Sequence, residues 1–306
     1  MIQLEKLTKK YGNLTAVDNL SLQIEEGEVF GLLGPNGAGK TTTIRMLCCL
    51  ISKTSGTATL NDLSIGNKKN CLEIRKMIGL LPENVGLYEN MTAYKNLDFY
   101  AKLYHCPENK RKERIEYYLK MLDLWGKKDV IVGTFSKGMK QKLAIARTLV
   151  HEPKILFMDE PTASLDPEAT KMVRDFILEL KKEKRTIFLN THMLDEAERI
   201  CDRVGILKTQ LLDIGSPEEL RKTLLGKKSV VMVDAINDNI LKNIKSLGFE
   251  QISIENNKMT IDVNDPRKDN PSIIQAIQDA GGLVQSISEL LPSLEDIYLK
   301  EIRRND

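Results

Sequence analysis

A glycine-rich stretch between an apolar strand and a helix limits the possible folds more than any other feature of the sequence. Residues 34–41 read GPNGAGKT and fit the pattern G-x-x-x-x-G-K-[S/T]. The apolar residues Val29–Leu33 before it predict a buried strand, and residues Lys40–Leu50 after it predict a helix. Glycines in such a loop let backbone N–H groups surround phosphate oxygens at the positive end of a helix. The stretch therefore predicts a strand, loop and helix that bind a phosphate-bearing ligand.

Two side chains of this loop suit a nucleoside triphosphate and its metal ion. Lys40 is expected to reach the β- and γ-phosphates, and the hydroxyl of Thr41 is expected to coordinate Mg²⁺. A glycine turn without a ligand is the alternative interpretation. The candidate nucleotide-binding residues of the loop are Gly34, Pro35, Asn36, Gly37, Ala38, Gly39, Lys40, Thr41 and Thr42.

Polar residues also follow two other predicted strands. The apolar strand Ile155–Met158 ends in Asp159 and Glu160, and His192 follows the strand Thr186–Asn190. Ligands bind at the carboxyl edge of parallel strands, so we expect Asp159 in the Mg²⁺ shell and Glu160 polarising a water molecule. His192 would contact the γ-phosphate or that water. Adjacent acids at a strand end are more often solvated, and a single histidine is more often structural, but the phosphate loop favours the functional interpretation.

The order of the remaining elements indicates an α/β fold. Residues 92–150 have mostly helical periodicity, and a helix is predicted over 168–183 and another over 193–204. The strands that alternate with these helices are almost entirely apolar, which is typical of a mostly parallel sheet covered on both faces. The sequence thus predicts one α/β domain over residues 1–215, with a helical subdomain at about 84–150.

A second, smaller domain is predicted after Gly215-Ser216-Pro217, where the pattern changes. Residues 216–306 show the order βαββαβ, with the second helix expected over 271–281 and a last helix after the final strand. This order favours a small α+β domain of the ferredoxin-like type. It has no His, Cys or glycine-rich loop, so we expect it to regulate or dock rather than to catalyse.

Composition limits the classes of partner. The 306 residues include 45 basic and 43 acidic side chains, a formal net charge of +2 that gives no reason to expect nucleic-acid binding. The five cysteines have no metal-site spacing and suit a reducing cytosol. The apolar runs are shorter than the roughly 18–20 residues of a membrane helix, and the N-terminus lacks the apolar core of a signal peptide. We expect a soluble chain whose membrane role, if any, comes through a partner.

The segment FSKGMKQKLAIARTL (135–149) predicts a helix with an unusual first turn. Ser136 occupies the N-cap position, and Lys137, Lys140 and Lys142 follow where the helix dipole is already positive. Lysines there are mildly unfavourable unless an anion is nearby. The chain's own phosphate loop already supplies a lysine and a helix N-terminus, so this second positive end suggests a nucleotide held by another subunit.

Five segments together resemble the ATP-binding subunits of ABC transporters over essentially all of residues 1–215. They are GPNGAGKTT (34–42), FSKGMKQK (135–142) in the place of the family signature, ILFMDEP (155–161), SLD (164–166) and NTH ending at His192. The closing PSLEDIYLKEI and the size of its domain resemble the efflux branch, which includes multidrug and antibiotic self-resistance exporters. The resemblance implies a P-loop ATPase that hydrolyses ATP with Mg²⁺.

The resemblance also implies partners, a location and residue roles. The chain would pair head to tail with a second ATP-binding subunit, identical or not, and drive a separate membrane permease from the cytoplasmic face. Glu160 would act as general base, and Ser136 and Gly138 would cap the partner's nucleotide. Adenine stacking is implied for Tyr11, γ-phosphate contact for His192 and communication across the dimer for Ser164 to Asp166. Thr41 and Asp159 would bind Mg²⁺ directly or through water, with Glu83 as a further magnesium ligand, and Lys40 and Glu83 would take part in catalysis.

Two departures from the family pattern stand out, and two other functions remain as alternatives. Glu83 occupies a position where the family usually has glutamine, and Lys137 and Met139 replace the usual glycine and glutamine of the signature. A carboxylate at position 83 is still an oxygen ligand. The alternatives are a non-transport ABC-type ATPase that acts on a ribosome, nucleic acid or regulator, and a small-molecule kinase with the same phosphate loop.

Overall fold

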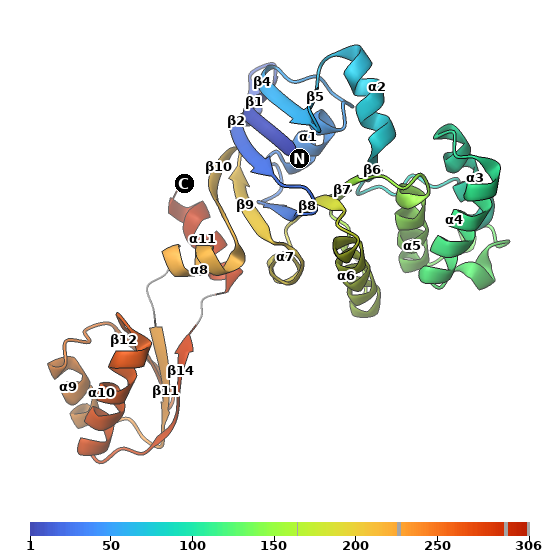
Figure 1. Ribbon diagram of the computed structural model, residues 1–306. Coiled ribbons are helices and arrows are strands. Elements are labelled where there is room, and N and C mark those ends of the chain that lie inside the picture. The colour runs from blue at the N-terminus through green and yellow to red at the C-terminus, as the bar shows by residue number, and fades with distance from the viewer. Residues whose placement is uncertain (164, 225–227, 291–292, 305–306) are drawn as a thin grey trace. The chain divides into compact units, whose positions relative to one another are not determined.

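The chain forms two compact units, Met1–Ser216 and Pro217–Asp306. The computed structural model (Figure 1) describes residues 1–163, 165–224, 228–290 and 293–304. The larger unit contains the phosphate loop and all of the other candidate site residues that the structure describes.

A six-stranded sheet forms the centre of the larger unit, in the order β10-β9-β3-β8-β7-β6. The five strands from β9 to β6 pair in parallel, whereas β10 runs antiparallel to β9 at one edge. The sheet is therefore mostly parallel, as the sequence predicts. The strands are β3 (Val29–Leu33), β6 (Ile78–Leu81), β7 (Ile155–Asp159), β8 (Thr186–Thr191), β9 (Arg203–Lys208) and β10 (Gln210–Gly215).

A second, antiparallel sheet has the order β2-β1-β4-β5. It consists of β1 (Ile2–Tyr11), β2 (Leu14–Ile24), β4 (Ser55–Leu60) and β5 (Leu63–Ser64). One apolar core joins the two sheets and the helix α1 (Lys40–Leu47), because Leu4, Ile44 and Phe157 belong to the same buried cluster. Helix α1, which follows directly on the phosphate loop, is therefore held by apolar burial against both sheets.

The helices of the larger unit fall into two groups. Helices α3 (Ala93–Leu103), α4 (Glu108–Met121) and α5 (Lys137–Leu149) contact one another and lie to one side of the sheet in Figure 1. Together with two short 3₁₀ turns, Trp125–Lys127 and Val132–Thr134, they occupy the predicted helical region. The others are α2 (Lys68–Met77), α6 (Pro167–Lys182) and α7 (Leu194–Ile200).

Two predicted helices are too long. Helix α1 ends at Leu47 rather than at residue 50, because Cys49 takes a left-handed φ of 56° and its N–H donates to Met46 O. Helix α7 ends at Ile200, and residues 203–204 begin strand β9. That ending has a tertiary cause, since the Asp202 carboxylate accepts a hydrogen bond from Val29 N at the start of β3.

The smaller unit contains the predicted βαββαβ order in an antiparallel sheet, β12-β13-β11-β14. Helix α10 begins at Pro266, five residues before the predicted start, because Asp265 caps it and Pro271 is accommodated inside it. Helix α8 and the last helix α11 pack against each other. The elements are α8 (Pro217–Leu224), β11 (Lys228–Val233), α9 (Asp238–Ser246), β12 (Ile252–Glu255), β13 (Lys258–Asp262), α10 (Pro266–Asp279), β14 (Val284–Leu290) and α11 (Leu294–Arg304).

Candidate nucleotide-binding site

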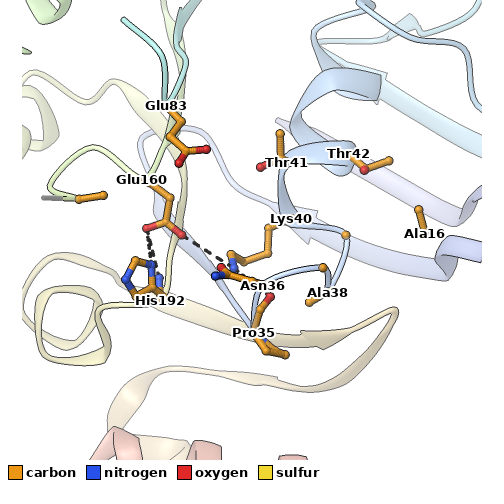
Figure 2. A pocket seen from close by; sticks show the side chains of 13 residues that line it. Ala16, Pro35, Asn36, Ala38, Lys40, Thr41, Thr42, Glu83, Glu160 and His192 are labelled. Atoms are coloured by element: carbon orange, nitrogen blue, oxygen red, sulfur yellow. Dashed lines mark hydrogen bonds and ion pairs between the residues drawn. The ribbon is translucent and has the colours of Figure 1, made fainter.

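A pocket of about 290 Å³ lies where the phosphate loop meets the carboxyl ends of β6, β7 and β8 (Figure 2). It brings together residues that are far apart in the sequence, as expected for the carboxyl edge of a parallel sheet. Its lining consists of Ala16, Pro35, Asn36, Gly37, Ala38, Gly39, Lys40, Thr41, Thr42, Glu83, Glu160, Ala163 and His192.

Two glycines of the loop are required by the backbone. A Cβ on Gly34 would lie 2.3 Å from Leu207 O, which is too close for any side chain. Gly39 has a φ of 103°, and a Cβ there would lie 2.3 Å from Ala16 O. These contacts hold the loop tightly against β9 and the start of β2, so its shape is set by the surrounding fold.

Lys40 turns back over the loop with its ammonium group in the pocket. Its Nζ donates to Gly34 O at 2.6 Å and to Pro35 O at 3.2 Å, and it lies 3.8 Å from Glu160 Oε1. Burial lowers the pKa of Lys40, against the opposing effect of the nearby Glu160, Asp159 and Glu83 carboxylates. A polyanionic ligand in this pocket would therefore find a buried ammonium group whose present partners are only neutral carbonyls and one loose ion pair.

Thr41, Asp159 and Asn190 form a connected polar group beneath the pocket. Thr41 Oγ1 donates to Asp159 Oδ1 at 3.1 Å, and Asn190 Nδ2 donates to the same oxygen at 3.0 Å. Asn190 is fully buried, and its Oδ1 has no hydrogen-bond partner among the residues that the structure describes. A buried amide oxygen without a partner is costly in a native fold, which indicates that a bound group or its water completes this cluster.

Glu160 stands at the mouth of the pocket in an unusual backbone conformation. Its φ is 52°, the left-handed region, and its N–H donates to Asn190 O at 3.0 Å. The carboxylate faces Lys40 on one side and lies 2.9 Å from His192 Nδ1 on the other (Figure 2). Strained residues of this kind cluster at functional sites, and here the strain turns a carboxylate away from the strand into the pocket.

Glu83 reaches the same pocket from the loop after β6 (Figure 2). The pocket therefore presents one ammonium group, two lining carboxylates and an imidazole to a ligand. This set can hold a triphosphate, take up a proton from an attacking water and contact the terminal phosphoryl group.

Six candidate residues do not line this pocket, although two of them, Gly34 and Asp159, accept hydrogen bonds from the lining residues Lys40 and Thr41. Tyr11 ends strand β1, is 48% exposed and has Lys9 Nζ at 4.7 Å from its ring centroid. Ser136 caps helix α5 and Gly138 lies in its first turn. Asp166 caps helix α6, accepting from Ala169 N at 2.8 Å. Ser164 lies outside the described residues, and the proposed contacts of the other four stay predictions.

The sequence interpretation missed Asn190. A signal was present, because Asn190 is a polar residue at the end of an otherwise apolar strand, two positions before His192. Pairing of β7 with β8 sets Asp159 opposite Asn190, and that register cannot be read from either strand alone. Ala16 and Ala163, which also line the pocket, carry no chemical signal at all.

Comparison with known proteins identifies the family. The family described as ABC transporter matches residues 17–163. The linearmycin resistance ATP-binding protein LnrL of Bacillus subtilis (strain 168) is 34% identical over 267 residues, covering 86% of this chain and 85% of that protein. The chain belongs to the ATP-binding proteins of ABC transporters. It is an ATPase of this family, and the resemblance drawn from its motifs is confirmed.

Two further ABC proteins support the similarity to the efflux branch and the ABC ATPase fold. The bacitracin transport ATP-binding protein BcrA of Bacillus licheniformis is 44% identical over 209 residues, covering 68% of this chain and 66% of that one. A dimeric, post-hydrolysis ATP-binding cassette bound to ADP and Pi superposes with a TM-score of 0.65 and 26% identity, covering 71% of this chain and 98% of that one. Residues 215–302 match the C-terminal domain of DrrA1-3-like ATP-binding proteins.

The similarity therefore extends over both units of this ABC ATPase. In the part of the chain that the structure describes, no helix combines the length and the hydropathy needed to cross a membrane.

Proposed function

We propose that this ABC ATPase is the motor subunit of an exporter. It would bind ATP between two subunits arranged head to tail and drive a separate permease from the cytoplasmic face of the membrane. One observation carries the proposal: the phosphate loop lines a pocket, yet Ser136, the N-cap of the helix α5 that begins in the segment FSKGMKQK and is called the signature helix below, does not line it. Relatives named for bacitracin transport and linearmycin resistance support export as the direction.

ATP binding relies on the loop and its lysine. The loop N–H groups and the positive start of α1 would bind the phosphates, while Lys40 exchanges its contacts with Gly34 O and Pro35 O for the β- and γ-phosphate oxygens. Glu160 would lose its ion pair with Lys40 in that exchange. Its carboxylate would then be free to accept a proton from the attacking water.

His192 would hold Glu160 in the orientation that hydrolysis needs. Its Nδ1 lies 2.9 Å from Glu160 Oε2, and its side chain is 55% exposed on the open side of the pocket. An imidazole in this position can orient the carboxylate with one nitrogen and contact the γ-phosphate with the other. Catalysis would then consist mainly of positioning and of stabilising the charge of the transferred phosphoryl group.

The residues beneath the pocket fit Mg²⁺. Thr41 and Asp159 would hold the ion and Glu83 would contact it directly or through water, and the ion would neutralise charge on the phosphates. No described cluster of three or more His, Cys, Asp or Glu side chains could hold a metal by itself. This suits Mg²⁺, which usually takes one or two carboxylates and completes its shell with phosphate oxygens and water.

We predict that Asn190→Ala raises the Mg²⁺ concentration that half-saturates ATP hydrolysis by roughly tenfold, as loss of a residue that orients a metal ligand does. Asn190 is one of two donors to Asp159 Oδ1, so its loss frees that carboxylate to rotate. Titration of ATPase activity with Mg²⁺ tests this. Asn243→Ala, which removes a hydrogen bond to Ala276 O in the smaller unit, should not change the titration. An unchanged titration for Asn190→Ala would contradict the role given to Asn190.

The signature helix would complete the site of the partner subunit. Ser136 and Gly138 present a hydroxyl and an unhindered backbone at the positive end of α5, next to Lys137. Lys140, by contrast, pairs with Glu89. A γ-phosphate held by a second subunit is the anion that this helix end would stabilise.

We predict that Ser136→Asp weakens ATP-dependent dimerisation at least tenfold, because a carboxylate would face the partner's γ-phosphate and like charges across an interface repel strongly. Aspartate keeps the N-cap that Ser136 provides to Met139 N, so the helix itself should persist. The measurement is sedimentation of the full chain with MgATP in a Glu160→Gln background. Asn237→Asp, the same kind of change at the N-cap of α9, is the matched control. Equal dimerisation of Glu160→Gln alone and of Glu160→Gln with either substitution would refute the binding of ATP between two head-to-tail subunits.

The exporter itself is tested by co-expression with a candidate permease encoded beside this gene. We expect the two proteins to co-purify from detergent extracts and the permease to change the ATPase rate. Recovery of the chain with ribosomes or nucleic acid instead would favour the non-transport alternative.

A further inference from the structure

Arg147 is a buried, charged residue that does not line the nucleotide pocket. It lies near the C-terminal end of α5 and is 9% exposed. In the described part of the chain no carboxylate pairs with it. Burial lowers the pKa of the guanidinium, and Tyr100 and Tyr104 oppose that effect. An arginine is almost never buried in this way unless its donors are satisfied, so its contacts indicate what it does.

The hydrogen bonds of Arg147 go to the loop that follows Glu83. Its Nη1 donates to Val85 O and to Gly86 O, the latter at 3.1 Å. The guanidinium also lies over the ring of Tyr100, with Cζ 5.1 Å from the ring centroid. The hydroxyl of Tyr100 donates to the same Gly86 O at 3.0 Å. Two side chains from two helices thus bind two consecutive carbonyls.

Neighbouring residues secure the same segment at both ends. Thr148 Oγ1, one position after Arg147, donates to Ala144 O at 2.9 Å in its own helix and also lies 3.3 Å from Leu80 O in β6. Asn96, fully buried in α3, accepts from Tyr88 N at 2.9 Å and donates to Tyr88 O at 3.0 Å. Side chains of α3 and α5 therefore hold the backbone from residue 80 to residue 88, and Glu83 projects from the middle of this stretch into the nucleotide pocket.

We propose that Arg147 is a positioning residue for ATP hydrolysis: with Tyr100 it fixes the Val85 and Gly86 carbonyls and thereby fixes where Glu83 stands in the pocket. This rests on the role proposed above for Glu83. Residues 82–88 form neither helix nor strand, so side-chain contacts from neighbouring elements hold this stretch. A misplacement of about 1 Å can lower a rate by roughly 100-fold. The guanidinium suits this task because several rigid donors can bind adjacent carbonyls at once.

The first experiment compares Arg147→Met with Arg185→Met in the full chain. Methionine keeps length and apolar packing but removes every donor. Arg185 is the matched control, because it also donates to a backbone carbonyl, Pro153 O at 2.8 Å, at the opposite end of strand β7. We expect amide hydrogen exchange across residues 82–88 to rise in Arg147→Met without nucleotide and to stay unchanged in Arg185→Met. Unchanged exchange in both would overturn the proposal.

The second experiment separates positioning from general stability. Arg147→Met should lower kcat about tenfold while the affinity for a fluorescent ATP analogue changes less than about twofold, because the phosphate loop is untouched. In a Glu83→Ala background the same change should lower kcat less than about twofold further, since the residue being positioned is gone. A full tenfold loss in that background would show that Arg147 acts on something other than Glu83.

Tyr100→Phe keeps the test decisive if Arg147→Met does not fold. This change removes only the hydroxyl that donates to Gly86 O and leaves the ring under Arg147. We expect a kcat loss of about two- to threefold that disappears in the Glu83→Ala background. Normal kcat for Glu83→Ala alone would contradict the proposed role of Glu83, whereas a Tyr100→Phe loss that persists without Glu83 contradicts only the positioning role.

Discussion

Glu160→Gln should lower the kcat of ATP hydrolysis by roughly 10²- to 10⁴-fold, the usual contribution of a general base, while ATP still binds. Glutamine has the same shape and can keep a hydrogen bond with His192, now found at 2.9 Å from the carboxylate. It cannot accept a proton from water at neutral pH. It also removes the negative charge 3.8 Å from Lys40, so affinity for the polyanionic nucleotide should be equal or higher. Steady-state phosphate release and nucleotide binding, measured separately, give the two quantities.

The matched control for this substitution is Glu179→Gln. Glu179 lies on α6 and is half exposed in an ion pair with Lys182, where such pairs contribute little. The Glu179→Gln variant should hydrolyse ATP at the normal rate. If Glu160→Gln kept full turnover, the base would have to be another group of the pocket, and Glu83 would be the next residue to test.

Lys40→Met should weaken MgATP binding by roughly 10- to 100-fold, because charge-assisted hydrogen bonds contribute about 1.5–3 kcal/mol each. Methionine approximates the length of lysine and fills the space of this buried side chain. It leaves the Glu160, Asp159 and Glu83 carboxylates, whose charges now act on Lys40, without a nearby cation. These carboxylates would then repel the triphosphate, so the loss of affinity should shrink as the salt concentration rises.

Lys53→Met is the matched control, because Lys53 Nζ also donates to a glycine carbonyl, Gly56 O at 2.6 Å, away from the pocket. Equilibrium binding of a fluorescent nucleotide to both variants compares them directly. Equal affinities would contradict the assignment of Lys40 to the phosphates, whatever the effect on turnover.

The sequence predicted the central elements of the fold well where local signals agree. Strand β3 spans the predicted residues Val29–Leu33, because a short, almost entirely apolar run that ends at a glycine-rich turn is typical of a buried strand. Strand β10 and helix α8 were missed. Strand β10 is mostly of intermediate burial and has no alternating apolar pattern, whereas α8 is only eight residues long and begins at Pro217, which was interpreted as part of a domain boundary. The early ends of α1 and α7 depend on a left-handed residue and on a carboxylate bound to another strand.

The sequence predicted those site residues whose chemical role follows from the residue type and its place in a motif. Lys40, Thr41, Glu83, Glu160 and His192 come together in one pocket, as the motifs imply. Asn190 and Arg147 lie within the quoted segments but escaped notice, because their contacts cross from one element to another and cannot be read from either segment alone. Such residues become visible only when strand register and helix packing are known.

The sequence by itself determined the phosphate loop, the acidic strand end and the ABC family. Each depends on residue types at short, fixed spacings, and the local backbone conformation follows from those residues. Only the tertiary structure decided how Glu160 faces both Lys40 and His192, how Asn190 meets Asp159 and how Arg147 holds the Glu83 loop. These contacts join residues 30 to more than 100 positions apart. Their geometry follows from the order of parallel strands and from the packing of α5, neither of which a local pattern encodes.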